Sequence, residues 1–218
     1  MKKIYPLFFL MIIVAIRSFS QERGIHVHQI EAELSQHTVS AITQDRHGFL
    51  WVGTLYGLNK FDGVQFTTYH QFDGNGDGLP SDNITAMITN QDGNLVIGTH
   101  GYGISIFDVS TQQFTNYAHD PENPNSLSSD GVVCLFEDKN GILWIGTERA
   151  GLNVFDPEKQ KFKRYFHADS SNTSAVGFDY ISAIQADAKG NMLVGTHGQG
   201  LGIIKKRSGQ IVQLHKAN

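Results

Sequence analysis

The chain has 218 residues, which is enough for one large all-β domain or two smaller domains. Its formal net charge is −4 and its 17 Lys and Arg residues are scattered, whereas a nucleic-acid-binding surface shows a basic face. Nucleic acid is therefore not expected as a partner, and the 23 glycines beside five prolines indicate the many tight turns of antiparallel β structure.

The first twenty residues are predicted to be a signal peptide rather than part of the fold. Lys2 and Lys3 precede an apolar run over 4–16, which is shorter than the roughly 20 residues that span a bilayer. Ser18 and Ser20 then provide small residues at the two positions that a signal peptidase reads, so cleavage is expected near Ser20. Arg17 lies unusually close to that cut, so an uncleaved anchor stays open as the alternative. No membrane span is expected after cleavage.

An internal repeat determines the fold prediction. The pair Gly-Thr recurs at steps of 45, 48 and 49 residues. Eight residues before each pair stands an Asp or Asn, and a Gly follows that residue by three. The four pairs are Gly53-Thr54, Gly98-Thr99, Gly146-Thr147 and Gly195-Thr196. A period of this size is typical of propeller blades.

Each repeat is predicted to contain four short strands separated by turn residues. In the first repeat we expect them near 39–44, 49–53, 58–61 and 65–69, because these runs are β-branched or aromatic. The fold class is therefore all-β: a β-propeller with four four-stranded antiparallel blades. After an N-terminal segment at 21–33, residues 34–218 would hold the blades at about 34–69, 79–117, 127–165 and 176–214. A right-handed β-solenoid competes, but its repeats are shorter and lack such hairpins.

Large apolar side chains are expected to fill the layers between blades, because a lone four-stranded sheet cannot bury both of its faces. Trp51 and Trp144 occupy equivalent positions two residues before the Gly-Thr pair and are predicted to lie in these layers. The single cysteine, Cys134, excludes an intramolecular disulfide and is predicted to be a buried, inert thiol.

The repeat motif resembles a known family. The segments 42–54 (ITQDRHGFLWVGT) and 135–147 (LFEDKNGILWIGT), each followed by Gly-Leu, are similar to the two-component regulator propeller repeat. In that family such repeats form the periplasmic sensor region of hybrid two-component sensor histidine kinases, often for polysaccharide breakdown products. The resemblance implies a sensing role. It implies no kinase activity for this chain, because no kinase segment is present in the sequence.

The number of outer strands does not fit a four-bladed ring. Residues 27–30 resemble a spare last strand, yet the fourth repeat already supplies its own at about 211–214. Since the family's rings have about seven blades, we expect an open arc or partial ring of a larger propeller, from a truncated sensor. A strained four-bladed ring and an eight-bladed ring of two copies are the alternatives. An open arc would expose apolar blade faces and favour self-association.

Ligand-binding candidates lie in the loops between the second and third strands, because such loops gather at one end of a propeller. The expected candidates are Tyr56, His100, Tyr102, Glu148, Arg149, His197 and Gln199. The tyrosines could stack on sugar rings, and Arg149 could pair with an acidic sugar. That these are ordinary polar loop residues stays open at each position.

No metal or other cofactor is expected. His100 and His197 are equivalent positions of the second and fourth repeats, so a blade separates them. Asp73, Asn75 and Asp77 match the first half of a calcium loop, but Ile84 stands where the bidentate Glu would be. A weak calcium site and a solvated turn therefore both remain open there.

These observations predict a non-catalytic, exported, ligand-sensing propeller segment of the periplasm, with an oligosaccharide as its ligand. Two other functions stay open. One is a propeller lyase or hydrolase like the streptogramin lyases, although the spacing identifies no Ser-His-Asp set and no close carboxylate pair. The other is a scaffold that binds proteins through the same loops.

Overall fold

The computed structural model describes residues 33–71, 78–165 and 180–214. The predicted signal peptide, the spare strand at 27–30 and the calcium candidates Asp73, Asn75 and Asp77 lie outside these residues. Within the described ranges, no helix is long and apolar enough to cross a membrane.

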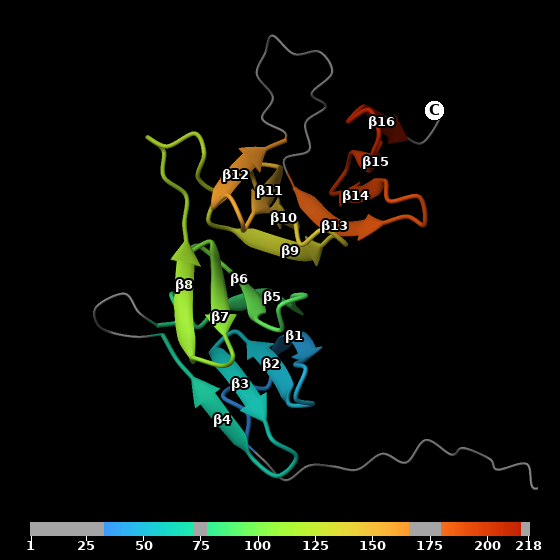
Figure 1. The fold of residues 1–218 in the computed structure, drawn as a ribbon. Coiled ribbons are helices and arrows are strands. Elements are labelled where there is room, and N and C mark those ends of the chain that lie inside the picture. The colour runs from blue at the N-terminus through green and yellow to red at the C-terminus, as the bar shows by residue number, and fades with distance from the viewer. Residues whose placement is uncertain (1–32, 72–77, 166–179, 215–218) are drawn as a thin grey trace, which may run out of the picture. The chain divides into compact units, whose positions relative to one another are not determined.

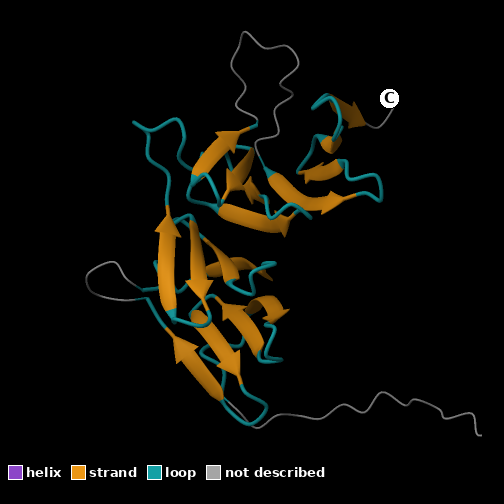
Figure 2. Ribbon diagram, viewed as in Figure 1, coloured by secondary structure: helices purple, strands orange, loops and turns teal. Residues whose placement is uncertain are grey.

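The described residues form sixteen strands in four separate sheets, each with four antiparallel strands in chain order (Figures 1 and 2). Blade 1 contains β1 (Val39–Gln44), β2 (Leu50–Thr54), β3 (Gly57–Phe61) and β4 (Phe66–Tyr69), and blade 2 contains β5 (Ile84–Thr89), β6 (Leu95–Thr99), β7 (Ile104–Asp108) and β8 (Gln113–Tyr117). Blade 3 contains β9 (Val132–Glu137), β10 (Leu143–Thr147), β11 (Leu152–Asp156) and β12 (Lys161–Arg164), and blade 4 contains β13 (Ile181–Ala186), β14 (Met192–Thr196), β15 (Gly200–Ile204) and β16 (Ile211–Leu214). The prediction of an all-β protein with four four-stranded antiparallel blades is confirmed.

The Asp of the repeat organises the turn between the first two strands of a blade. One carboxylate oxygen of Asp45 accepts hydrogen bonds from the amides of His47 and Phe49, at 2.9 and 3.1 Å. The other oxygen accepts the indole N–H of Trp51 at 2.8 Å. Gly48 closes the turn at a φ of 89°, in the left-handed region that favours glycine. The spacing of Asp, Gly and Trp in the repeat is therefore the spacing of one hydrogen-bonded turn.

The hydrogen bonds of this turn differ in the other three blades. In blade 3, Trp144 donates to Asp138 at a longer 3.4 Å. In blade 2, Val96 has no N–H to donate from its side chain, and Asn90 replaces the Asp. In blade 4, the second carboxylate oxygen accepts the side-chain amide of Asn191 instead, at 2.7 Å. Each aspartate of this turn thus keeps a donor for its second carboxylate oxygen, and in blade 1, where Asp45 is buried, burial of a polar group requires one.

Three apolar clusters form the layers between consecutive blades. Each combines residues from the second and third strands of one blade with residues from the next blade, mainly from its first three strands. The layer between blades 1 and 2 joins Trp51 and Leu58 to Ile84, Met87, Leu95, Ile97 and Phe107; the layer between blades 2 and 3 joins Val96 and Ile104 to Val132, Leu143, Ile145, Phe155 and Phe162; the layer between blades 3 and 4 joins Trp144 and Leu152 to Ile181, Ile184, Met192, Val194 and Ile204. Trp51 is fully buried and Trp144 is 8% exposed, which agrees with the predicted place of both in the layers.

The glycine of each Gly-Thr pair allows the next blade to approach closely. At the first three glycines a Cβ atom would lie within 2.7 Å of a methyl carbon of the next blade, a distance that real Cβ atoms do not reach. The pairs are Gly53 with Ile84 at 2.6 Å, Gly98 with Val132 at 2.6 Å, and Gly146 with Ile181 at 2.7 Å. Glycine is therefore needed here for its missing side chain, because none of the three has a positive φ.

The first and fourth blades each carry a face that no described residue covers. In blade 1, Ile42 is 64% exposed and Leu50 is 38% exposed. Their equivalents in blade 2, Met87 and Leu95, are 7% and 0% exposed, because they pack on blade 1. In blade 4, a Cβ at Gly195 would meet nothing closer than the Ser182 hydroxyl oxygen at 3.3 Å. These two faces repeat the sequence pattern of the buried layers, but no described blade packs against them.

Contacts between the inner strands follow the chain order. β1 contacts β5, β5 contacts β9, and β9 contacts β13. No contact of that extent joins β1 to β13 among the described strands, so these four blades are a series and not a closed ring.

Cys134 lies at the layer between blades 3 and 4. Its thiol donates a hydrogen bond to the Ile181 carbonyl oxygen at 3.5 Å, and burial raises the pKa of the thiol to about 12. The side chain is only partly buried, less than its apolar neighbours in sequence suggested. The raised pKa favours the protonated, less reactive thiol, and its inertness stays a prediction.

Candidate functional site

The threonine of each Gly-Thr pair fixes the loop between the second and third strands. In every blade its hydroxyl donates to the carbonyl oxygen of the glycine that begins the third strand or precedes it. The four hydrogen bonds are Thr54 to Gly57 at 3.0 Å, Thr99 to Gly103 at 2.9 Å, Thr147 to Gly151 at 2.8 Å, and Thr196 to Gly200 at 2.9 Å. The loops that carry the candidate residues are therefore held by the repeat itself.

Aspartates in the linkers tie these loops to the next blade. The Asp130 carbonyl oxygen accepts the amides of Gly101 and Gly103, both at 3.0 Å. The Asp130 carboxylate accepts the amide of His119 at 2.6 Å. Asp82 does the same one blade earlier, where its carbonyl oxygen accepts the Gly57 amide at 2.8 Å. Loop and linker are thus joined by hydrogen bonds in both places.

A cavity of about 340 Å³ opens where the loops and linkers of all four repeats meet. Its lining residues are Ser40, Leu55, Ile84, Thr85, His100, Val132, Val133, Glu148 and Tyr180. The Thr85 hydroxyl oxygen is buried and has no hydrogen-bond partner among the described residues. An unsatisfied buried hydroxyl at a cavity is a place where a polar ligand would gain a hydrogen bond.

A second cavity of about 550 Å³ adjoins the first, between blades 2 and 3. The two share His100 and Glu148, and the second adds His119, Asp130 and Arg149. The Glu148 carboxylate lies 4.0 Å from His100 Nδ1 and 3.9 Å from Arg149 Nε. Since the Arg149 side chain is 84% exposed, this pairing contributes little to stability and leaves the guanidinium accessible to a ligand.

The chemistry available at these cavities is recognition of polar groups. Carboxylate, imidazole, guanidinium and hydroxyl groups lie beside an apolar wall of Leu55, Ile84 and Val132. This combination is common where proteins bind small polar ligands. Among the described residues no three His, Cys, Asp or Glu side chains are grouped closely enough to hold a metal ion.

The structure brings three of the seven predicted residues together. His100, Glu148 and Arg149 line the shared cavities. Tyr56 and Tyr102 are 59% and 51% exposed and line neither cavity, and the Tyr56 ring instead meets His70 edge-on at 5.4 Å.

The remaining two predicted residues belong to blade 4. The His197 ring lies 5.5 Å from the Tyr180 ring, and through Tyr180 it adjoins the smaller cavity. Gln199 is exposed, and its carbonyl oxygen accepts the Gln213 side-chain amide at 3.0 Å. Neither side chain lines a cavity.

Several lining residues were not among the predicted ones, most notably Asp130, Thr85 and Tyr180. A signal for Asp130 exists, because Ser-Asp recurs at Ser81-Asp82 and Ser129-Asp130, the same 48-residue step that separates the second and third Gly-Thr pairs. Thr85 and Tyr180 have no comparable signal, since they differ from the equivalent residues of the other repeats.

Comparison with known proteins supports the repeat assignment. Residues 33–56 and 126–149 match the family model described as two component regulator propeller. These segments contain the Asp-Gly-Trp turns and Gly-Thr pairs of blades 1 and 3. Histidine kinase P4 of Formosa agariphila is 61% identical over 36 residues, which are 16% of this chain and 3% of the kinase.

Solved structures show the same fold. The extracellular domain of the hybrid two-component system BT3049 from B. thetaiotaomicron superimposes with a TM-score of 0.77 and 26% identity, over 88% of this chain and 26% of that one. Virginiamycin B lyase from Staphylococcus aureus superimposes with a TM-score of 0.59 and 18% identity, over 81% of this chain and 55% of the lyase. The chain thus spans about a quarter of the length of the BT3049 extracellular domain.

The family model covers two of the four repeats, and the hydrogen-bonded turns and close glycines extend the same structural pattern to the other two. The chain is a series of four β-propeller blades, and two of its repeats match the two component regulator propeller model.

Proposed function

We propose that this chain is an exported, non-catalytic sensor segment of a two-component regulatory system, and that it binds an oligosaccharide where its loops meet. The observation that carries the proposal is the pair of adjoining cavities that share His100 and Glu148. The rigid attachment of loops to linkers supports it, because a preorganised site loses less entropy on binding.

The relatives support the sensing context. The BT3049 structure is an extracellular domain of a hybrid two-component system, and Histidine kinase P4 shares a stretch at high identity. Export to the periplasm agrees with the predicted signal peptide at residues 1–20. An oligosaccharide suits the cavities because its hydroxyl groups can donate to Glu148 and accept from Arg149 and Thr85.

Calorimetric titration with a panel of oligosaccharides tests this proposal. We expect saturable binding of at least one compound, weakened at least fivefold by Glu148→Gln and by Arg149→Ala. Glu158→Gln is the matched control, because Glu158 is exposed in the β11–β12 turn at the other end of blade 3. Absence of saturable binding, or binding that neither loop variant weakens, would contradict the proposal.

A lyase is the second candidate function, and the His100–Glu148 pair in the cavity favours it, since an imidazole beside a carboxylate can transfer protons. The virginiamycin B lyase likeness supports only the shared fold at 18% identity. Incubation with a streptogramin B antibiotic separates the two candidates. Turnover that His100→Ala abolishes would establish the lyase; intact antibiotic beside saturable oligosaccharide binding would establish the sensor.

We also propose that the chain associates with its own copies through the uncovered faces of blades 1 and 4. These faces carry the two complementary halves of the three internal layers. Pairing of the blade-4 face of one copy with the blade-1 face of another would bury Ile42 and Leu50 as Met87 and Leu95 are buried. Binding of a different protein to the loops is the scaffold alternative, which the oligosaccharide titration also tests.

A further inference from the structure

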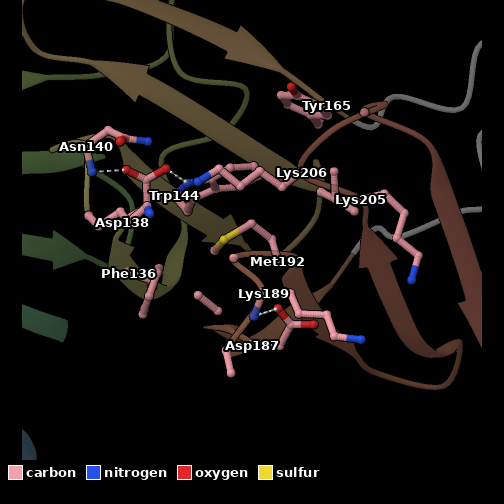
Figure 3. A pocket seen from close by; sticks show the side chains of 16 residues that line it. Phe136, Asp138, Asn140, Trp144, Tyr165, Asp187, Lys189, Met192, Lys205 and Lys206 are labelled. Carbon is pink, nitrogen blue, oxygen red and sulfur yellow. Dashed lines mark hydrogen bonds between the residues drawn. The ribbon is translucent and has the colours of Figure 1, made fainter.

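A third cavity, between blades 3 and 4, lies at the other end of the strands from the loop cavities. It has a volume of about 530 Å³ and is bordered by the β9–β10, β13–β14 and β15–β16 turns (Figure 3). Trp144, Tyr165 and Met192 provide its apolar lining. Figure 3 shows Asp138 and Asn140 of one turn facing Asp187 and Lys189 of another across it.

A change of side-chain volume explains why this cavity exists. At the other two layers a phenylalanine fills the equivalent space: Phe107 lies 5.4 Å from the Trp51 ring, and Phe155 lies 4.8 Å from the Tyr117 ring. Blade 4 has Ile204 at this position, which lacks a ring. Close packing leaves few voids in protein interiors, so a missing ring beside Trp144 opens space.

The edge of the cavity also differs from its equivalents. At the first layer the Arg46 guanidinium lies directly over Gly93, where an added Cβ would be 1.9 Å from its Nε. At the second layer the Gln91 side chain donates to the Asp138 carbonyl oxygen at 2.6 Å. The equivalent residue at the third layer is Lys139, whose ammonium group lies beside Lys206. A side chain of one blade therefore reaches the next blade at the edge of the first two layers, whereas lysine ammonium groups border the third.

Four lysines and two aspartates line this cavity, so the lysine charges are only partly offset and the lining has an excess of positive charge. The lysines are Lys139, Lys189, Lys205 and Lys206, and none forms an ion pair with a described carboxylate. The Lys139 ammonium, by hydrogen bonding and by repulsion, lowers the pKa of Lys206. Two cations held this close gain stability when an anion binds between them.

The two carboxylates at the cavity are already used by their own turns. Asp138 accepts the Asn140 amide at 2.8 Å and the Trp144 indole N–H, and Asp187 accepts the Lys189 amide at 2.8 Å. They stabilise the turns but keep their negative charges, which offset two of the four lysine charges and leave a net positive lining for an anionic ligand.

We propose that this cavity is a second binding site, specific for an anionic oligosaccharide. A sugar ring would pack against Tyr165 and the exposed edge of Trp144, whose ring centroids are 5.8 Å apart, and its carboxylate or sulfate would bind Lys139 and Lys206. Aromatic rings bind the apolar faces of sugars, and ammonium groups bind single anions without the fixed geometry of arginine. The site is independent of the loop cavities, so it does not require the function proposed above.

Tryptophan fluorescence and calorimetry with defined probes test the site. The probes are trigalacturonic acid, a sulfated disaccharide, a neutral trisaccharide and inorganic sulfate. We expect the two anionic sugars, or one of them, to bind at least tenfold more tightly than the neutral sugar and inorganic sulfate. Binding of only one identifies carboxylate or sulfate as the recognised group. Equal binding of the neutral sugar, or equal binding of inorganic sulfate, overturns the proposal.

Two variants locate the binding. Lys139→Gln combined with Lys206→Gln should weaken the anionic sugar at least tenfold, whereas Lys161→Gln, an exposed lysine of β12 outside the cavity, should not. Ile204→Phe should fill the cavity as Phe107 and Phe155 do and abolish binding. Glu148→Gln, at the loop cavities, should leave this binding unchanged. Retained binding in the double lysine variant, or its loss in Glu148→Gln alone, would place the ligand elsewhere and contradict the proposal.

Discussion

Blade 2 and the two end blades use the same sequence pattern in different surroundings. Met87 is 7% exposed in blade 2, while its equivalent Ile42 in blade 1 is 64% exposed. Gly98 faces the Val132 methyl group of the next blade, while Gly195 in blade 4 faces no following blade among the described residues. The repeat therefore specifies both halves of an interface in every blade, and a neighbour decides whether each half is buried. Substitutions at equivalent positions of a covered and an uncovered blade can separate the effect of the sequence pattern from the effect of the neighbouring blade.

A charge at the covered position should have the largest effect. Met87→Glu buries a carboxylate in the layer between blades 1 and 2, which should lower the free energy of unfolding by roughly 3 kcal/mol. Ile42→Glu places the same group at the solvent and should change it by no more than about 0.5 kcal/mol. Urea unfolding followed by tryptophan fluorescence measures both values.

Sedimentation velocity over a concentration series completes this test. The wild-type chain should associate through its uncovered faces, and Ile42→Glu should reduce that association. If Ile42→Glu destabilised the chain as much as Met87→Glu at concentrations where the chain is monomeric, the face of blade 1 would be covered by a part of the same chain.

A methyl group at the close glycines should have an intermediate effect. Gly98→Ala puts a Cβ 2.6 Å from the Val132 methyl carbon, so overpacking should cost about 1–3 kcal/mol. At Gly195 the nearest atom is 3.3 Å away, and Gly195→Ala should be neutral within about 0.5 kcal/mol. Thermal unfolding of the two variants measures the difference. Equal midpoints would show that Val132 does not lie against Gly98.

Acid should weaken covered and uncovered blades alike, because the turns are local. Hydrogen bonds from Gln65 and Val64 lower the pKa of Asp62 in blade 1, and the side-chain amide of Asn191 does the same for Asp187 in blade 4. In the covered blade 2, hydrogen bonds from Ser110 and Thr111 lower the pKa of Asp108. A carboxyl with a depressed folded pKa adds stability above its usual value of 3.8 and loses it as pH falls through the folded pKa. The urea concentration at the midpoint of unfolding should therefore decrease as the pH is lowered below about 4.

The contribution of a single turn can be separated from this acid response. Asp187→Asn removes one titrating carboxyl, so the slope of stability against pH should become shallower in that range. An unchanged slope would show that the pKa of Asp187 is the same in the folded and the unfolded chain.

The local parts of this structure could be predicted from the sequence, and the contacts between repeats could only partly. The turn around Asp45 and Gly48 was predictable because its signals lie within a few residues. The meeting of His100 with Glu148 was harder to predict, since they come from different blades and Tyr56 carried an equally good loop signal. The cavity beside Trp144 depends on one ring that Ile204 lacks, and volume differences between blades leave no periodic signal.

The close approach of blades at the Gly-Thr pairs is the claim on which the fold and both sites depend. Methyl-labelled nuclear Overhauser spectroscopy of the wild-type chain measures it directly. We expect cross-peaks from the Hα atoms of Gly53, Gly98 and Gly146 to the methyl groups of Ile84, Val132 and Ile181 respectively. Absence of these three cross-peaks from a folded sample would contradict the stacked-blade account.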